Sequence, residues 1–76
     1  MKIVTLVQMK ENQKGKVSEI AGAALRQRLM SMGLYPGREV TRLSRFVLKG
    51  PVMIKVGRST IALGHDMAGK VKVQVE

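Results

Sequence analysis

The sequence contains no cysteine, and this absence removes several kinds of chemistry at once. Without cysteine there is no disulfide bond, no thiolate metal ligand and no thiol nucleophile. A chain without cysteine fits a reducing compartment. The longest apolar stretch is about IAGAAL (20–25), far below the ~20 residues that span a bilayer. We therefore expect no insertion into a membrane.

Acidic residues are also scarce, which argues against an enzyme. A general acid and a general base must converge on one cleft, and no two carboxylates here share a helical spacing. The sequence also has neither a nucleophile elbow nor a phosphate-binding loop. We therefore expect no catalytic activity and no catalytic residues. The five acidic residues are Glu11, Glu19, Glu39, Asp66 and Glu76.

Basic residues, by contrast, are abundant. Fourteen lysines and arginines give a formal net charge of +9. Such a charge favours acidic partners, which include nucleic acid, anionic lipid headgroups and acidic protein surfaces. Single-stranded nucleic acid binds to aromatic platforms, but this chain has only Tyr35 and Phe46, and we expect Phe46 in the core. Because the basic residues form no dense run, nucleic-acid binding is the weaker alternative.

The 76 residues are enough for one domain, which we expect to span 1–76. Residues 23–33, AALRQRLMSMG, form the one predicted helix of substance. Leu25, Leu29 and Met32 share one arc of a helical wheel and should pack on the rest of the fold. Gly33 should end the helix in the left-handed conformation, with Leu34 folding back on the last turn.

A tight turn follows directly on this helix end. In YPGR, Pro36 presets φ for the first central position of a turn and Gly37 accepts a positive φ at the second. Helix end and turn together reverse the chain within a few residues. We therefore expect the helix to lie across one end of the sheet that follows.

Most of the remaining chain reads as β-strand. Val71, Val73 and Val75 alternate with polar residues, as the buried face of a strand does. The turn 64–69 should hold a short helical turn capped by Asp66. The fold class is therefore mainly β, a small, partly open barrel of about five strands with one short helix. The predicted strands are 1–9, 15–22, 38–48 (with a bend), 51–57, 60–63 and 70–76.

One pair of side chains could hold a metal ion. His65 and Asp66 are an imidazole and a carboxylate at adjacent positions. Two ligands are too few for a closed zinc site, so we expect no required cofactor and read Asp66 as a cap and His65 as a surface residue. Weak binding of a divalent cation (Fe, Mn or Zn), or binding between two subunits, is the alternative.

The helix also carries a candidate docking surface. Arg26 and Met30 lie together on the wheel, away from the arc of Leu25 and Leu29. Methionine packs adaptably against partners, so these two residues could form a contact surface. The alternative is that Met30 fills space against the rim of the barrel.

The sequence resembles the FeoA family over nearly its whole length. The segment LRQRLMSMGLYPGREV is similar to the family pattern L-R-x-R-L-x-x-x-G-L-x-P-G-x-x-V. The residues that meet this pattern are Leu25, Arg26, Arg28, Leu29, Gly33, Leu34, Pro36, Gly37 and Val40. Further matches are Gly15, Val17, Ile20 and Gly22 upstream, and Pro51, Ile54, Val56, Ala62, Leu63, Ala68, Val71 and Val73 downstream.

The resemblance implies an SH3-like barrel without catalytic activity. It also implies a cytoplasmic accessory protein of ferrous iron uptake that associates with the membrane transporter FeoB, whose cytoplasmic part binds GTP. We expect the contact to involve Arg26, Met30, Tyr35 and Arg38, because helix and corner are the chain's one departure from a plain barrel. The alternative is a metal-responsive regulatory domain or a nucleic-acid-binding barrel. Self-association stays open.

Overall fold

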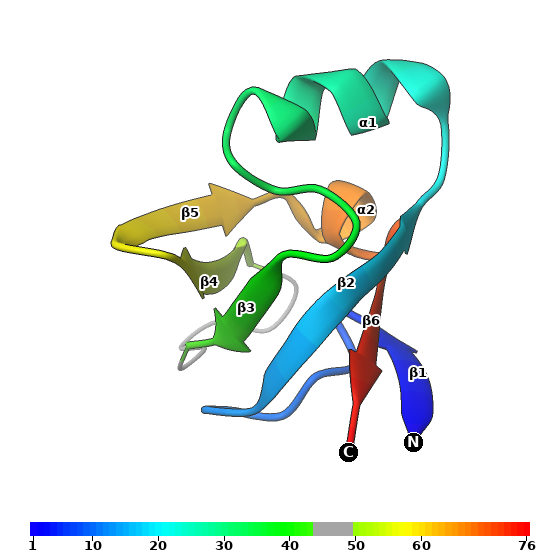
Figure 1. Cartoon of the computed structure of the whole chain (residues 1–76). Coiled ribbons are helices and arrows are strands. Elements are labelled where there is room, and N and C mark those ends of the chain that lie inside the picture. Colours follow the sequence, from blue (N-terminus) through cyan, green and yellow to red (C-terminus); the bar gives the residue numbers. More distant parts are fainter. Residues whose placement is uncertain (44–49) are drawn as a thin grey trace.

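Alternating apolar residues pair into one antiparallel sheet. The strands are β1 (Lys2–Thr5), β2 (Lys14–Ile20), β3 (Glu39–Arg42), β4 (Val52–Val56), β5 (Ser59–Leu63) and β6 (Val71–Val75). The structure is a computed structural model and describes residues 1–43 and 50–76. Within these residues the strand order is β1-β6-β2-β3-β4-β5, with β1 and β5 at the edges (Figure 1). The mainly β fold and its partly open sheet agree with the prediction.

The curled sheet encloses a core of aliphatic side chains. In β6 the valines are buried and Lys72 between them is exposed, so the predicted alternation is confirmed. The inward faces of β4 and β5 follow the same rule. The buried apolar residues are Leu6, Met9, Val17, Ile20, Leu29, Leu34, Val40, Val52, Ile54, Val56, Ile61, Leu63, Ala68, Val71, Val73 and Val75.

A glycine allows β2 and β6 to approach closely inside this curl. A Cβ at Gly15 would lie 2.9 Å from the carbonyl oxygen of Gln74 and 2.9 Å from Cγ1 of Val75, and would also overlap Val73. Contacts this short do not occur between well-packed atoms, so a larger residue would push the strands apart. The missing side chain at Gly15 therefore sets the tight curvature here.

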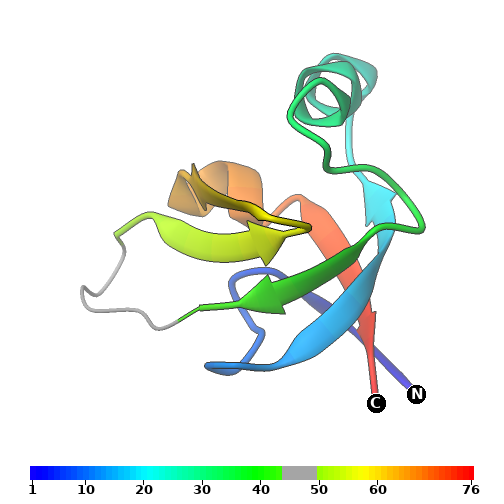
Figure 2. The same ribbon diagram turned by 60° about the vertical axis from the view of Figure 1, so that its left-hand side comes forward.

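The helix α1 (Ala23–Met30) stands over one end of the sheet and packs on β2 (Figures 1 and 2). Its C-terminal end is a Schellman motif, in which the amide of Leu34 donates to the Leu29 carbonyl at 2.9 Å and that of Gly33 donates to the Met30 carbonyl at 3.0 Å. Gly33 has φ 88° and Leu34 is completely buried, which confirms both predictions. The inward place predicted for Met32 is wrong, because it lies beyond α1 with 42% of its surface exposed.

The turn after the helix has the predicted geometry. The amide of Arg38 donates to the Tyr35 carbonyl at 3.0 Å, and Gly37 has φ 95°. The chain is then tied to β2, because the Gly37 amide donates to the Val17 carbonyl and the Val17 amide donates to the Arg38 carbonyl, both at 2.8 Å. The corner is therefore hydrogen-bonded to the sheet before β3 begins.

Some predicted boundaries differ from the structure. The second half of the strand predicted at 38–48, with Phe46, lies outside the described residues, and β3 covers Glu39–Arg42. The predicted turn at 64–69 contains α2 (His65–Ala68), but no side-chain hydrogen bond caps it. Its N-cap residue is Gly64, so the capping role predicted for Asp66 is wrong.

Candidate interaction surfaces

The outer face of α1 presents long side chains to solvent. Met30 is 53% exposed, and Arg26, one turn earlier on the helix, is also exposed. Met32, beyond the helix end, is exposed as well. Leu29 is buried and Leu25 is half-buried, because the opposite side of α1 faces the sheet. The structure therefore leaves Arg26 and Met30 accessible, as a docking surface requires.

Tyr35 and Arg38 form a pair at the corner. Nη1 of Arg38 donates to the Tyr35 hydroxyl at 3.1 Å, and the guanidinium carbon lies 5.7 Å from the ring centroid. Both residues are half-buried. Nη2 of Arg38 also reaches the β4–β5 hairpin, where a Cβ at Gly57 would lie 2.5 Å away. This pair braces the corner against the hairpin, so it is less free to contact a partner than Arg26 and Met30 are.

The two candidate metal ligands lie on the surface. His65 and Asp66 are both exposed at the start of α2. Among residues 1–43 and 50–76, no group of three or more His, Cys, Asp or Glu side chains gathers in one place. The arrangement thus offers two adjacent ligands, and metal binding stays a prediction.

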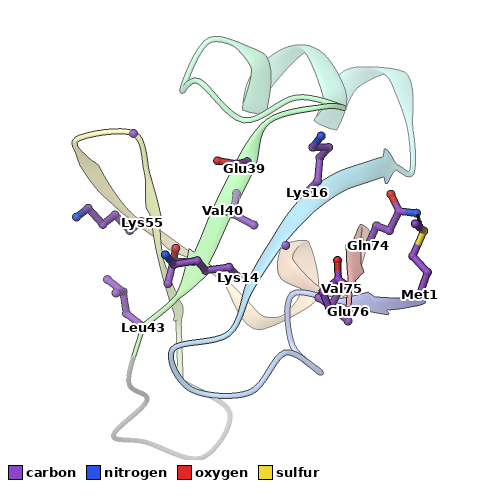
Figure 3. Close-up of a pocket in the computed structure, with 13 residues that line it drawn as sticks. Met1, Lys14, Lys16, Glu39, Val40, Leu43, Lys55, Gln74, Val75 and Glu76 are labelled. Atoms are coloured by element: carbon purple, nitrogen blue, oxygen red, sulfur yellow. Dashed lines mark hydrogen bonds between the residues drawn. The ribbon is translucent and has the colours of Figure 1, made fainter.

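A broad hollow of about 820 Å³ lies against the outer face of β2, β3 and β4 (Figure 3). Lys14 and Lys16 from β2 and Lys55 from β4 line it, together with the carboxylates of Glu39 and Glu76. The sequence shows these lysines as scattered, because they come from different strands. Only the strand register brings Lys14 and Lys55 to the same place.

One arginine is buried, which the sequence does not indicate. Arg42 in β3 is only 2% exposed, and its Nη1 donates to the carbonyls of Leu6, Val7 and Met9 at 2.7, 3.2 and 3.1 Å. These bonds fasten the segment after β1 to β3. A basic residue in a strand is expected to face solvent, so only the loop carbonyls opposite Arg42 reveal its role.

The comparisons with known proteins agree with this architecture. The family model of the FeoA domain matches residues 4–75. The crystal structure of an iron uptake regulatory protein (FeoA) is 39% identical, with a TM-score of 0.85, and the match covers 97% of each chain. The FeoA protein from Chlorobium tepidum is 23% identical with a TM-score of 0.84, and the match covers 95% of this chain and 70% of that one. None of the curated proteins compared with this chain matches it significantly.

The same fold occurs within larger proteins. A manganese-dependent transcriptional repressor is 20% identical with a TM-score of 0.84, and the match covers 97% of this chain but only 42% of the repressor. At this identity the likeness shows the fold alone. Within the described residues no helix is both long enough and apolar enough to cross a membrane. The six-stranded sheet, the family match over residues 4–75 and the 39% identical structure show an SH3-like protein that belongs to the FeoA family.

Proposed function

We propose that this chain is a non-enzymatic cytoplasmic accessory protein of ferrous iron uptake, which docks on the cytoplasmic GTP-binding part of a FeoB-like transporter and regulates it. The family match over residues 4–75 carries this proposal. The 39% identical relative, described as an iron uptake regulatory protein, supports the regulatory role. The charge of +9 suits an acidic partner surface.

We assign the docking contact to the outer face of α1. Met30 supplies an exposed, adaptable apolar side chain and Arg26 supplies a charge beside it. Tyr35 and Arg38 complete this surface by holding the corner in place through their hydrogen bond. The exposed residues on α1 then make the contact, and the braced corner keeps them in position.

A binding assay with the purified cytoplasmic domain of a FeoB-like transporter tests this proposal. The double variant Arg26→Glu and Met30→Asp should weaken binding at least about tenfold, because buried anchors at an interface each contribute more than ~1 kcal/mol. The matched control is Arg58→Glu with Ile3→Asp, which makes comparable changes of charge and polarity at exposed positions outside α1. Equal losses in both double variants would reject the α1 surface, and no binding by the unaltered protein would reject the docking.

The alternative function is a metal-responsive or nucleic-acid-binding domain, which the basic charge favours. DNA binding that weakens steeply with salt would support it, whereas absent DNA binding at moderate salt supports the accessory role. Calorimetry with Fe(II), Mn(II) or Zn(II), repeated on His65→Ala, tests weak metal binding at His65 and Asp66. No metal is required for the proposed docking.

A further inference from the structure

We propose that the hollow on the outer face of β2, β3 and β4 binds an acidic, extended peptide segment of a partner protein. This surface is separate from the residues assigned to docking on α1, and the inference does not depend on the identity of the transporter. The hollow has a volume of about 820 Å³, and its lining includes Lys14, Thr41 and Lys55.

The strand register places one lysine on each side of the Thr41 hydroxyl. Lys14 lies opposite Thr41 in the β2–β3 pair, and Thr41 lies opposite Lys55 in the β3–β4 pair. Directly opposed residues have Cβ atoms about 5 Å apart, so the flexible stems of Lys14 and Lys55 can bring both ammonium groups over Thr41. Figure 3 shows Lys14 extending from β2 across β3 toward the side of Lys55.

This group of donors is available to a ligand. Lys14 and Lys55 are exposed, and Thr41 is half-buried. In the described part of the chain, none of the three side chains makes a hydrogen bond or an ion pair. Two ammonium groups on flexible stems and one hydroxyl can together donate to the same oxyanion.

The other residues of the hollow favour a peptide carboxylate over a nucleic-acid backbone. Glu39 and Glu76 also line the hollow, but they repel carboxylates and phosphates alike and so do not discriminate between the two ligands. Among residues 1–43 and 50–76, no aromatic side chain on which a base could stack lines the hollow. Leu43, half-buried at the side of the hollow, can contact an apolar residue of a peptide. A second copy of this chain is a poor occupant, because each copy carries a charge of +9.

An extended peptide also fits the spacing of the positive charges. Lys14 and Lys16 lie on the same face of β2, two residues apart, which corresponds to about 6.6 Å along a strand. Alternate side chains of an extended ligand have the same spacing. Glu39 lies opposite Lys16 and partly offsets its charge, so Lys14 and Lys55 should contribute most of the attraction.

Fluorescence anisotropy with a labelled polyglutamate peptide tests the proposal. The double variant Lys14→Gln with Lys55→Gln should weaken binding about fivefold or more, since each exposed ion pair contributes up to ~1 kcal/mol. The control Lys70→Gln with Lys72→Gln removes the same charge at exposed positions outside the hollow and should change affinity less than about twofold. Thermal unfolding of both variants checks that they fold.

Three results would overturn the proposal. Equal weakening by both double variants would mean that only net charge attracts the peptide. If the unaltered protein does not bind polyglutamate detectably, an acidic peptide is not its ligand. If a labelled oligothymidine binds more tightly than polyglutamate and this binding depends on Lys14 and Lys55, the ligand is nucleic acid instead. Shifts of the Lys14, Thr41 and Lys55 amide signals on titration with polyglutamate would support it. The α1 variant Arg26→Glu with Met30→Asp should still bind polyglutamate. The experiment therefore distinguishes failure of the docking proposal on α1 from failure of the peptide proposal in the hollow.

Discussion

Replacement of the buried Arg42 should destabilise the protein strongly. We choose Arg42→Met, because methionine keeps a long unbranched side chain and removes the guanidinium. The Nη1 bonds of Arg42 reach three carbonyls, of Leu6, Val7 and Met9, in a segment that belongs to no strand. In the turns and loops of residues 1–43 and 50–76, no backbone amide donates a hydrogen bond to any of these three carbonyls.

The expected loss follows from these contacts. The bonds to Leu6 and Met9 are buried, whereas the bond to Val7 is partly buried. A buried acceptor left without a donor costs about 1–3 kcal/mol, and two such acceptors give about 2–6 kcal/mol. Water that reaches one of the two carbonyls would reduce this cost, so we expect the free energy of unfolding to fall by about 3 kcal/mol. In a domain of this size that lowers the melting temperature by about 12–24 °C.

Urea unfolding and thermal melting of the variant measure this loss. The matched control is Lys10→Met, which also removes one positive charge but at an exposed position, and it should change stability by less than about 0.5 kcal/mol. Replacement of a buried charge by an apolar residue stabilises some proteins. Arg42→Met with unchanged or higher stability would therefore refute the reasoning, because desolvation of the guanidinium would then outweigh its bonds.

The remaining predictions concern packing and backbone conformation, and urea unfolding measures each of them. Gly15→Ala should lower the free energy of unfolding by about 1–3 kcal/mol through overlap with β6, which exceeds the ~0.4–1 kcal/mol by which alanine stabilises a protein by restricting its unfolded chain. A more stable variant would contradict the close approach of β2 and β6. A Cβ at Gly33 would lie within 4 Å of no atom beyond the adjacent residues, so Gly33→Ala should lower the free energy of unfolding only by the ~1–2 kcal/mol that a left-handed backbone costs alanine. An unchanged free energy of unfolding would contradict the Schellman motif. Leu34→Ala should lower the free energy of unfolding by about 2–5 kcal/mol, whereas Met32→Ala should lower it by less than about 0.5 kcal/mol. Similar decreases for the two variants would show that Met32 is packed.

The parts of the fold governed by local sequence were predictable. Gly33 and Leu34 ended the helix as expected, because the Schellman motif depends on residues that are neighbours in the chain. The valines of β6 alternated as expected, because period 2 follows from the geometry of one strand.

The misses at Met32 and Asp66 are local, whereas those at Arg42, Lys14 and Lys55 come from distant contacts. Met32 matched the helical arc, but the helix ends before it, so its side chain stays exposed. Arg42 is buried because loop carbonyls more than thirty residues earlier in the chain accept its hydrogen bonds, which no local pattern encodes. Lys14 and Lys55 are neighbours only through the register of three strands. Family resemblance identified the protein's class, but only the strand pairing revealed this lysine-lined hollow.

The corner between α1 and β3 has a consequence for the speed of association. Its hydrogen bonds, from Leu34 to Leu29 and from Gly37 to Val17, already hold the chain in one conformation in the free protein. A partner that docks on α1 meets a backbone that needs no rearrangement, so little backbone conformational entropy is lost on binding. Encounter with an oppositely charged partner should then be governed by diffusion and electrostatic attraction, with rates that fall as salt is added.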